Sequence, residues 1–201
     1  MADTKISAMS NAATPLTGAE LVPLVQGGVN VKSTIANFGQ YARSAYANFG
    51  GWEDTTTQVG STTVGTPFTY NQGDYTNNGV TLVSNSRLTV AVAGVYNLQW
   101  SAQFQNTDTA PQDAIVWIRI NGVDVPGSAG VVGLPARKNP GDPFHSIYGW
   151  NFFVTLTAGQ YVEVVWTKTS ANITVPAYPA SLVAPVYPST ASVVVTLQQV
   201  A

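Results

Sequence analysis

The stretch that decides the fold is Val95-Tyr96-Asn97-Leu98-Gln99-Trp100-Ser101-Ala102-Gln103-Phe104-Gln105. Apolar residues occupy every even position, and amide or hydroxyl residues occupy every odd position after Val95. Successive side chains of a β-strand point to opposite faces, so this alternation predicts a strand with one buried face. A register shift of one residue would expose the whole apolar set, which predicts fixed pairing in an antiparallel sheet.

Further short strands follow this pattern through the C-terminal two thirds of the chain. We expect them at Phe68–Tyr70, Val80–Val83, Leu88–Val92, Val95–Gln105, Ile115–Ile120, Val123–Val125, Trp150–Leu156, Tyr161–Thr167 and Val193–Val200. Asn121-Gly122 is typical of a two-residue hairpin turn. Because no crossover helix intervenes, the sequence predicts an all-β fold, an antiparallel jelly-roll β-sandwich over residues 67–201.

Charge is scarce in this sequence. Only 9% of its 201 residues are charged, and the last charged side chain is Lys168. With eight Lys or Arg and ten Asp or Glu, the protein has no net positive charge that would attract nucleic acid. No apolar run in the sequence reaches the roughly 18 residues of a membrane span. The neutral surface favours coverage by other protein, so we expect a homo-oligomer.

Residues 1–33 predict an extended N-terminal arm. Gly27-Gly28 separates two short apolar segments and indicates a hairpin, which needs a surface to lie on because an isolated hairpin is marginal in water. The alternative is that it packs on its own domain. The residues expected to anchor the arm are Leu16, Leu21, Val22, Pro23, Leu24, Val25, Gly27 and Gly28.

A short helix and a linker are expected over residues 34–66. Ser33 or Thr34 can cap a helix that stops at Gly50-Gly51, while residues 52–66 suit a linker or a first strand. The helix would either meet a partner helix or dock on its own sheet. Its apolar seam is Ile35, Phe38, Ala42, Ala45 and Phe49.

Two long loops and a set of aromatic residues are the candidate contact regions. The loops span Pro126–Ile147 and Ala171–Ser189, and the prolines of the second would limit its loss of entropy on docking. Tyr178 and Tyr187 are its contact candidates, unless the loop lies across its own domain. Core or trimer-contact positions are Tyr96, Leu98, Trp100, Phe104, Trp150, Phe152 and Trp166. Strand tryptophans, here Trp100, Trp117, Trp150 and Trp166, could alternatively line a sugar site.

The sequence contains few residues of the types and patterns that form catalytic or metal sites. The absence of cysteine excludes disulfides and thiolate metal sites, and His145 is the only histidine. No nucleophile elbow occurs, so we expect a non-enzyme without metal or cofactor. Asp108 and Asp113 remain as an alternative carboxylate pair for glycoside cleavage. Because residues 1–10 lack the apolar core of a secretion signal, synthesis in the cytoplasm is expected.

Two motifs resemble a known fold family. Gly94-Val95-Tyr96 opens the alternating strand, and Leu156-Thr157-Ala158-Gly159-Gln160-Tyr161-Val162 turns between two aromatic strands. Both are similar to motifs of the C1q and tumour-necrosis-factor-like jelly rolls, over roughly residues 66–201. Gln160 stands where that family commonly has an acidic residue, so neither calcium binding nor a complement-like function is carried over.

A second resemblance concerns the role of the protein. The segment from Leu16-Thr17-Gly18-Ala19-Glu20 through Gly27-Gly28 into Lys32-Ser33-Thr34 resembles N-terminal segments of virion proteins of tailed bacteriophages. Asn78-Gly79-Val80, Ser84-Asn85-Ser86, Trp100–Gln103 and Ala177-Tyr178-Pro179-Ala180 are similar to jelly-roll modules of such proteins. Members of this group are typically trimers whose N-terminal arm is seated on the particle.

This second resemblance implies a structural virion protein, made in the host cytoplasm. The leading expectation is a trimeric capsid decoration or cement protein whose arm binds the major capsid protein or another virion protein. The alternative is a head or tail fibre or appendage that binds host surface glycan. A hydrolase is the third and weakest interpretation.

Overall fold

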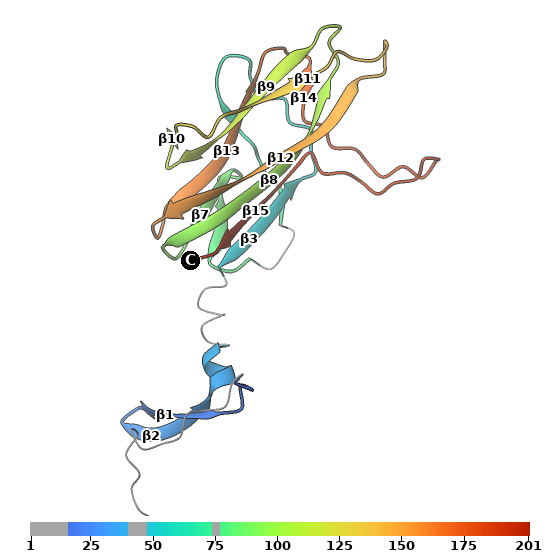
Figure 1. Cartoon of the computed structure of the whole chain (residues 1–201). Coiled ribbons are helices and arrows are strands. Elements are labelled where there is room, and N and C mark those ends of the chain that lie inside the picture. Colours follow the sequence, from blue (N-terminus) through green and yellow to red (C-terminus); the bar gives the residue numbers. More distant parts are fainter. Residues whose placement is uncertain (1–15, 40–47, 74–76) are drawn as a thin grey trace, which may run out of the picture. The chain divides into compact units, whose positions relative to one another are not determined.

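The chain divides into two compact units, Met1–Tyr46 and Ala47–Ala201. The computed structural model describes residues 16–39, 48–73 and 77–201 (Figure 1). The described structure is almost entirely antiparallel β, as the sequence predicts. Its strands are β1 (Leu21–Gln26), β2 (Val29–Thr34), β3 (Phe49–Asp54), β4 (Thr66–Pro67), β5 (Gln72–Gly73), β6 (Val80–Val83), β7 (Arg87–Val90), β8 (Gly94–Asn106), β9 (Gln112–Ile120), β10 (Val123–Asp124), β11 (Gly130–Leu134), β12 (Phe144–Leu156), β13 (Tyr161–Lys168), β14 (Ile173–Thr174) and β15 (Val193–Gln199).

The alternating stretch forms β8, a central strand of a six-stranded sheet. The sheet order is β12-β8-β15-β3-β5, with β14 also paired to β8. All five apolar residues of the alternation are buried: Tyr96, Leu98, Trp100, Ala102 and Phe104. Their polar neighbours point to the other side, so the register that the sequence requires is the register that forms.

A seven-stranded sheet covers the apolar side of this sheet. Its order is β10-β9-β13-β7-β6, with β11 on β9 and β4 on β13. Asn121 and Gly122 join β9 to β10 with φ angles of 48° and 81°, the backbone that the predicted two-residue turn requires. The two sheets enclose one core and form a sandwich-like architecture, while the jelly-roll topology stays a prediction.

Aromatic rings from both sheets meet in the centre of the core. Phe68 stacks on Trp166 of β13 at 5.4 Å between ring centroids, and Phe104 of β8 meets Trp166 edge-on at 5.9 Å. Phe68 also lies 6.1 Å from Trp100 of β8. Because all four side chains are buried, these rings join the two sheets and make the sandwich a single packing unit.

Several sequence-based boundaries need correction. Phe49, expected in the helix seam, is the first residue of β3, so residues 49–51 are strand rather than helix; from Trp52 the structure has the first strand that was one of the two alternatives. The helix is described only over residues 35–39, and Ala42 and Ala45 lie outside the described residues. The expected loop at Pro126–Ile147 contains β11 and the start of β12. Phe68 and Tyr70 are buried beside β4 and Thr69 between them is exposed, but none of the three is assigned to a strand.

The N-terminal unit contains the hairpin that the sequence predicts. β1 pairs antiparallel with β2 from Leu21↔Thr34 to Gln26↔Val29. Gly27 and Gly28 between them have φ angles of 60° and 79°, a left-handed backbone that suits a tight hairpin turn. The Glu20 carboxylate accepts hydrogen bonds from the backbone and hydroxyl of Thr17 and from the Gly18 N–H, each at 2.8 Å, which lower the pKa of Glu20 to about 2.

Tyr70 offers a test of the core that depends on pH. Its hydroxyl is buried without a hydrogen-bond partner among the described residues. Burial raises the pKa of Tyr70 far above its usual value, and the Asp54 and Glu163 carboxylates add to the rise. We expect Tyr70→Phe to leave the free energy of unfolding at pH 7 unchanged or to raise it by about 1 kcal/mol, because it removes a buried group with no partner.

Alkaline pH should increase the difference in the free energy of unfolding between the native chain and Tyr70→Phe. Above pH 10 the unfolded chain releases the Tyr70 proton while the folded chain keeps it, so the stability of the native protein falls as the pH rises, by up to about 1.4 kcal/mol per pH unit from this group. Tyr70→Phe should show a shallower decline in urea unfolding between pH 9 and 11. Identical slopes for the two proteins would show that the hydroxyl is not isolated from solvent.

Candidate interaction surface

Charged residues are divided unequally between the two sheets. The seven-stranded sheet carries Arg87, Asp113, Arg119, Asp124, Glu163 and Lys168 in its strands. Strands β8, β12, β14 and β15 of the six-stranded sheet carry no Asp, Glu, Lys or Arg, and β3 carries Glu53 and Asp54. The Asp54 side chain is buried and accepts hydrogen bonds from Thr56 and Thr69. Glu53 is therefore the one carboxylate on the outer side of this sheet's described strands.

We call the outer side of β12, β8 and β15 the neutral face. It consists of the odd positions 145–155 of β12 and 95–105 of β8 with Val194, Thr196 and Gln198 of β15. Small side chains meet in its middle, where Ser101 pairs with Gly149 on one side and Val194 on the other. Because the neutral face carries no charged side chain, it can be covered by another protein surface without burying an unpaired charge.

A shallow groove follows β15 along the neutral face. Three hollows compose it, and neighbouring hollows share a residue. The first, of about 200 Å³, is lined by residues 190–194 with Ser101, Gln103 and Ile147. The second, of about 230 Å³, lies between residues 99–101 and 194–196. The third, of about 300 Å³, lies between Phe49, Gly50 and residues 196–198.

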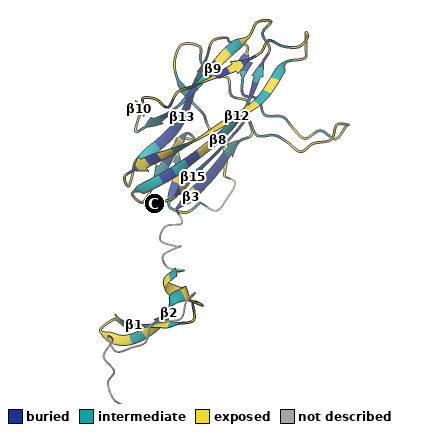
Figure 2. Cartoon of the chain, in the orientation of Figure 1, coloured by how far each residue is buried: buried dark blue, intermediate teal, exposed yellow. Residues whose placement is uncertain are grey.

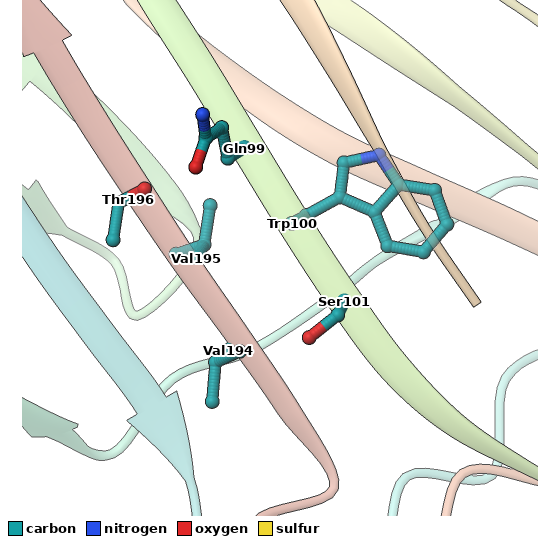
Figure 3. Close-up of a pocket in the computed structure, with 6 residues that line it drawn as sticks. All are labelled: Gln99, Trp100, Ser101, Val194, Val195 and Thr196. Atoms are coloured by element: carbon teal, nitrogen blue, oxygen red, sulfur yellow. The ribbon is translucent and has the colours of Figure 1, made fainter. Parts of the chain in front are cut away.

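We call this feature the β15 groove. Figure 3 shows its middle, where Gln99 and Ser101 on β8 lie beside Val194 and Thr196 on β15. Val194 joins the first hollow to the second and Thr196 joins the second to the third. The three hollows therefore follow one another along the strand, and their lining side chains are apolar, amide or hydroxyl groups.

His145 marks one end of the neutral face. Burial lowers the pKa of His145, and Lys138 lowers it further while Asp142 opposes the shift. The shift favours the uncharged form of the imidazole. The Tyr178 ring meets it edge-on at 5.8 Å between centroids, while Lys138, Asp142 and Arg137 border this end of the face.

Strand β12 forms an edge of the six-stranded sheet. Its 13 residues pair with β8 alone among the described strands, and parts of β12 are coloured as exposed in Figure 2. Ile147 and Phe153 point outward and are exposed. Long edge strands without charge or proline readily pair with other chains. β12 therefore extends the neutral face as a surface suited to protein contact.

The described part of the N-terminal unit has no buried residue (Figure 2). Its apolar side chains lie on both faces of the hairpin, with Leu21, Val25 and Val29 exposed. Leu24, Val31 and Phe38 line a hollow of about 420 Å³ within the unit. A two-stranded hairpin of this kind lacks a core of its own and gains stability when another surface covers its apolar side chains.

The predicted site residues fall into three groups. Tyr96, Leu98, Trp100, Phe104 and Trp166 lie in the core, Phe152 is partly buried against it, and Trp150 is half exposed at the β12 edge. The anchoring residues Leu16, Leu21, Pro23, Val25, Gly27 and Gly28 are exposed, and Val22 and Leu24 are partly exposed. Ile35 and Phe38 lie in the described helical turn, while Tyr178 and Tyr187 lie in a loop that leaves the sandwich.

Asp108, one of the two carboxylates considered for glycoside cleavage, has structural contacts. Asp108 accepts hydrogen bonds from Ser170 at 2.8 Å and Asn172 at 3.2 Å, and these bonds lower the pKa of Asp108 to about 2. An ionised, hydrogen-bonded carboxylate ties the loop before β9 to the loop after β13, and it lacks the raised pKa of a general acid.

Two negative findings apply to the described ranges, 16–39, 48–73 and 77–201. Within them, no three His, Asp or Glu side chains are placed to hold a metal ion. Also within them, no helix has the length and apolarity to cross a membrane.

Comparison with family models and curated protein sequences gives no relative. No protein-family model matches the sequence, and no curated protein sequence is significantly similar to it. The resemblances drawn from short motifs therefore stay predictions.

Proposed function

We propose that this chain is a structural protein of a tailed-bacteriophage virion. In this proposal three copies associate through their sandwiches, which have jelly-roll topology, and the N-terminal units attach the trimer to the capsid shell. The protein decorates and stabilises the shell and performs no turnover. The motif resemblances supply the virion context, and the structure supplies surfaces suited to both contacts.

One observation carries the proposal. None of the described residues of the N-terminal unit is buried, although Leu21, Val25, Val29 and other large apolar side chains occupy it. Burial of apolar area stabilises an association by about 25 cal/mol per Å², so a hairpin with no core of its own has a large gain available on docking. A docking element fits this pattern better than an independent domain.

Association of the sandwiches would strengthen this attachment. The neutral face contains exposed Ile147 and Phe153 and no Asp, Glu, Lys or Arg, which suits contact between copies. Joining several weak anchors in one assembly raises the overall affinity by about 10²- to 10⁴-fold through effective concentration. A hairpin of marginal stability can then hold a trimer on the shell.

Capsid binding tests the proposal directly. Full-length protein, added to undecorated capsids, should co-sediment with them and raise their disruption temperature. A chain that lacks residues 1–33 should do neither. The point variant Leu24→Asp should bind at least about tenfold more weakly, because docking would bury an unpaired carboxylate at a cost above about 1.4 kcal/mol.

Asn30→Asp is the matched control for Leu24→Asp. It adds the same charge to the same hairpin at an exposed position beside the turn. We expect it to bind capsids like the native chain. Equal capsid binding by the truncated chain or by Leu24→Asp would contradict the proposed attachment.

A fibre or appendage protein that binds host glycan is the second candidate. The observation in its favour is Trp150, whose side chain is 48% exposed and whose ring lies 5.0 Å from the Phe152 ring. Exposed aromatic faces can stack on the apolar faces of sugars. The number of copies on purified virions separates the candidates, because decoration needs hundreds and a fibre needs a handful.

A further inference from the structure

The chain between β14 and β15 leaves the sandwich as a narrow loop. We call residues 178–190 the projecting loop (Figure 1). Two pairs of backbone hydrogen bonds hold its sides together, between Tyr178 and Thr190 at 2.9 and 3.3 Å and between Ser181 and Tyr187 at the same two distances. The loop is therefore an ordered hairpin-like element, and Figure 1 shows it extending away from both sheets.

The tip of the projecting loop is apolar and uncovered. The exposed fractions of its large side chains are 87% for Leu182, 78% for Val183, 71% for Val186 and 43% for Tyr187. A group of large exposed apolar side chains on one projection is costly in water unless it is covered. The tip is thus a strong candidate for a contact element.

The base of the loop is fixed to the sandwich. Gln103 of β8 donates a hydrogen bond to the Pro176 carbonyl at 3.3 Å, and the Ala177 N–H donates to the Thr57 hydroxyl at 3.3 Å. The Tyr178 ring packs against His145 of β12. Because the base is anchored and prolines stiffen the loop, the tip loses little conformational entropy when it docks.

A groove of matching chemistry lies on the same molecule. The β15 groove is lined by apolar, amide and hydroxyl groups and contains no Asp, Glu, Lys or Arg side chain in its lining. The chain likewise has no charged side chain after Lys168, so the loop tip is neutral. Contact between tip and groove would bury apolar area without desolvating a lining charge, while Glu53, the β3 partner of Val194, borders the groove and would stay in contact with water.

The loop cannot fill the groove of its own copy. Thr190, at the base of the loop, lines the first hollow of the groove, and the loop extends away from the sheet at that point (Figure 1). The tip is therefore directed to a neighbouring molecule. A second copy of this chain carries the complementary groove and is present wherever the protein is.

We propose that the tip of the projecting loop, residues 181–187, of one copy docks in the β15 groove of the next copy. The inference deepens the proposed function, since it rests on the homo-oligomer and names the elements in contact. Tip and groove are different surfaces, so each copy uses both, and the contacts run head to tail. Such contacts close into a ring when the rotation between copies permits it, as in a trimer.

The chain has no cysteine, so cysteines introduced in pairs would be the only thiols that a cross-linker can join. We would introduce Leu182→Cys at the tip together with Thr196→Cys in the groove and treat the protein with a short bis-maleimide linker. The expected product under denaturing conditions is a covalent ladder that ends at the trimer. Each single variant should stay largely as a single chain, because tip meets groove rather than tip.

The matched control pairs Leu182→Cys with Val83→Cys, an exposed position on β6 of the other sheet. This pair should give no ladder above the level of the single variants. Equal cross-linking of the two pairs, or none in a protein that remains oligomeric, would overturn the assignment of tip to groove.

A loop variant separates this inference from the proposed function. We would replace residues 181–187 by two glycines and compare its mass by light scattering with that of the native chain, while near-ultraviolet circular dichroism reports the fold. At least a tenfold increase in the dissociation constant of the folded variant is expected. An unchanged oligomer would overturn the loop contact alone, whereas a monomeric native protein would overturn the proposed oligomer as well.

Discussion

Gln99→Glu is expected to convert the oligomer into monomers at micromolar concentration and pH 7. Gln99 lies in the middle of the neutral face, opposite Thr196 of β15 and Asn151 of β12. The substitution keeps the size of the side chain and adds one charge. A buried charge without a partner costs about 3–5 kcal/mol, so each contact should weaken by two orders of magnitude or more. Light scattering behind size-exclusion chromatography measures the change in mass.

The matched control is Gln160→Glu. It adds the same charge in the turn between β12 and β13, where the Gln160 side-chain oxygen accepts the Thr157 N–H at 2.9 Å, and a carboxylate keeps that bond. This variant should retain the native mass. Below about pH 4 the carboxyl introduced by Gln99→Glu would be protonated, and that variant should regain part of its association. Two variants of equal mass at pH 7 would mean that the neutral face is not the contact surface.

The central strand was predictable because its information is local. Strand β8 alternates from Tyr96 to Gln105, and only one register buries its rings. The N-terminal hairpin was predictable for the same reason, since Gly27-Gly28 determines the turn and thereby the pairing of β1 with β2. In both places a single stretch of chain specifies the structure.

The start of strand β3 at Phe49 was missed because its glycines suggest the end of a helix. In the structure Gly50 allows the Trp52 ring to fold back over the strand, and a Cβ at Gly50 would collide with that ring. Strand β11 was missed because Gly130-Val131-Val132-Gly133-Leu134 is short and lies in a region of prolines and charges. In each case tertiary contacts override a local preference for a break.

The β15 groove could not be located from the sequence. It is lined by residues of β3, β8 and β15, which are far apart in the chain and become neighbours only in the folded sheet. What the sequence does contain is the absence of charge after Lys168 and throughout β8. The lack of charged residues predicts a surface that another protein covers. Only the fold shows where on the molecule that surface lies.

Phe68→Ala should cause the largest loss of stability of the single variants considered. The Phe68 side chain is fully buried and stacks on Trp166 while contacting Trp100 and Phe104 from the opposite sheet. Removing a buried aromatic ring costs about 3–5 kcal/mol, through lost burial and the cavity left behind. That is a large part of the roughly 5–15 kcal/mol that stabilises an ordinary domain.

Urea unfolding of a monomeric background isolates this effect from association. We would therefore place Phe68→Ala in the Gln99→Glu chain and compare it with Phe153→Ala in the same chain. Phe153 is exposed on β12, so its truncation should change the free energy of unfolding by no more than about 0.5 kcal/mol. Equal losses for the two variants would contradict a shared core, because only Phe68 lies between the sheets and connects their aromatic rings.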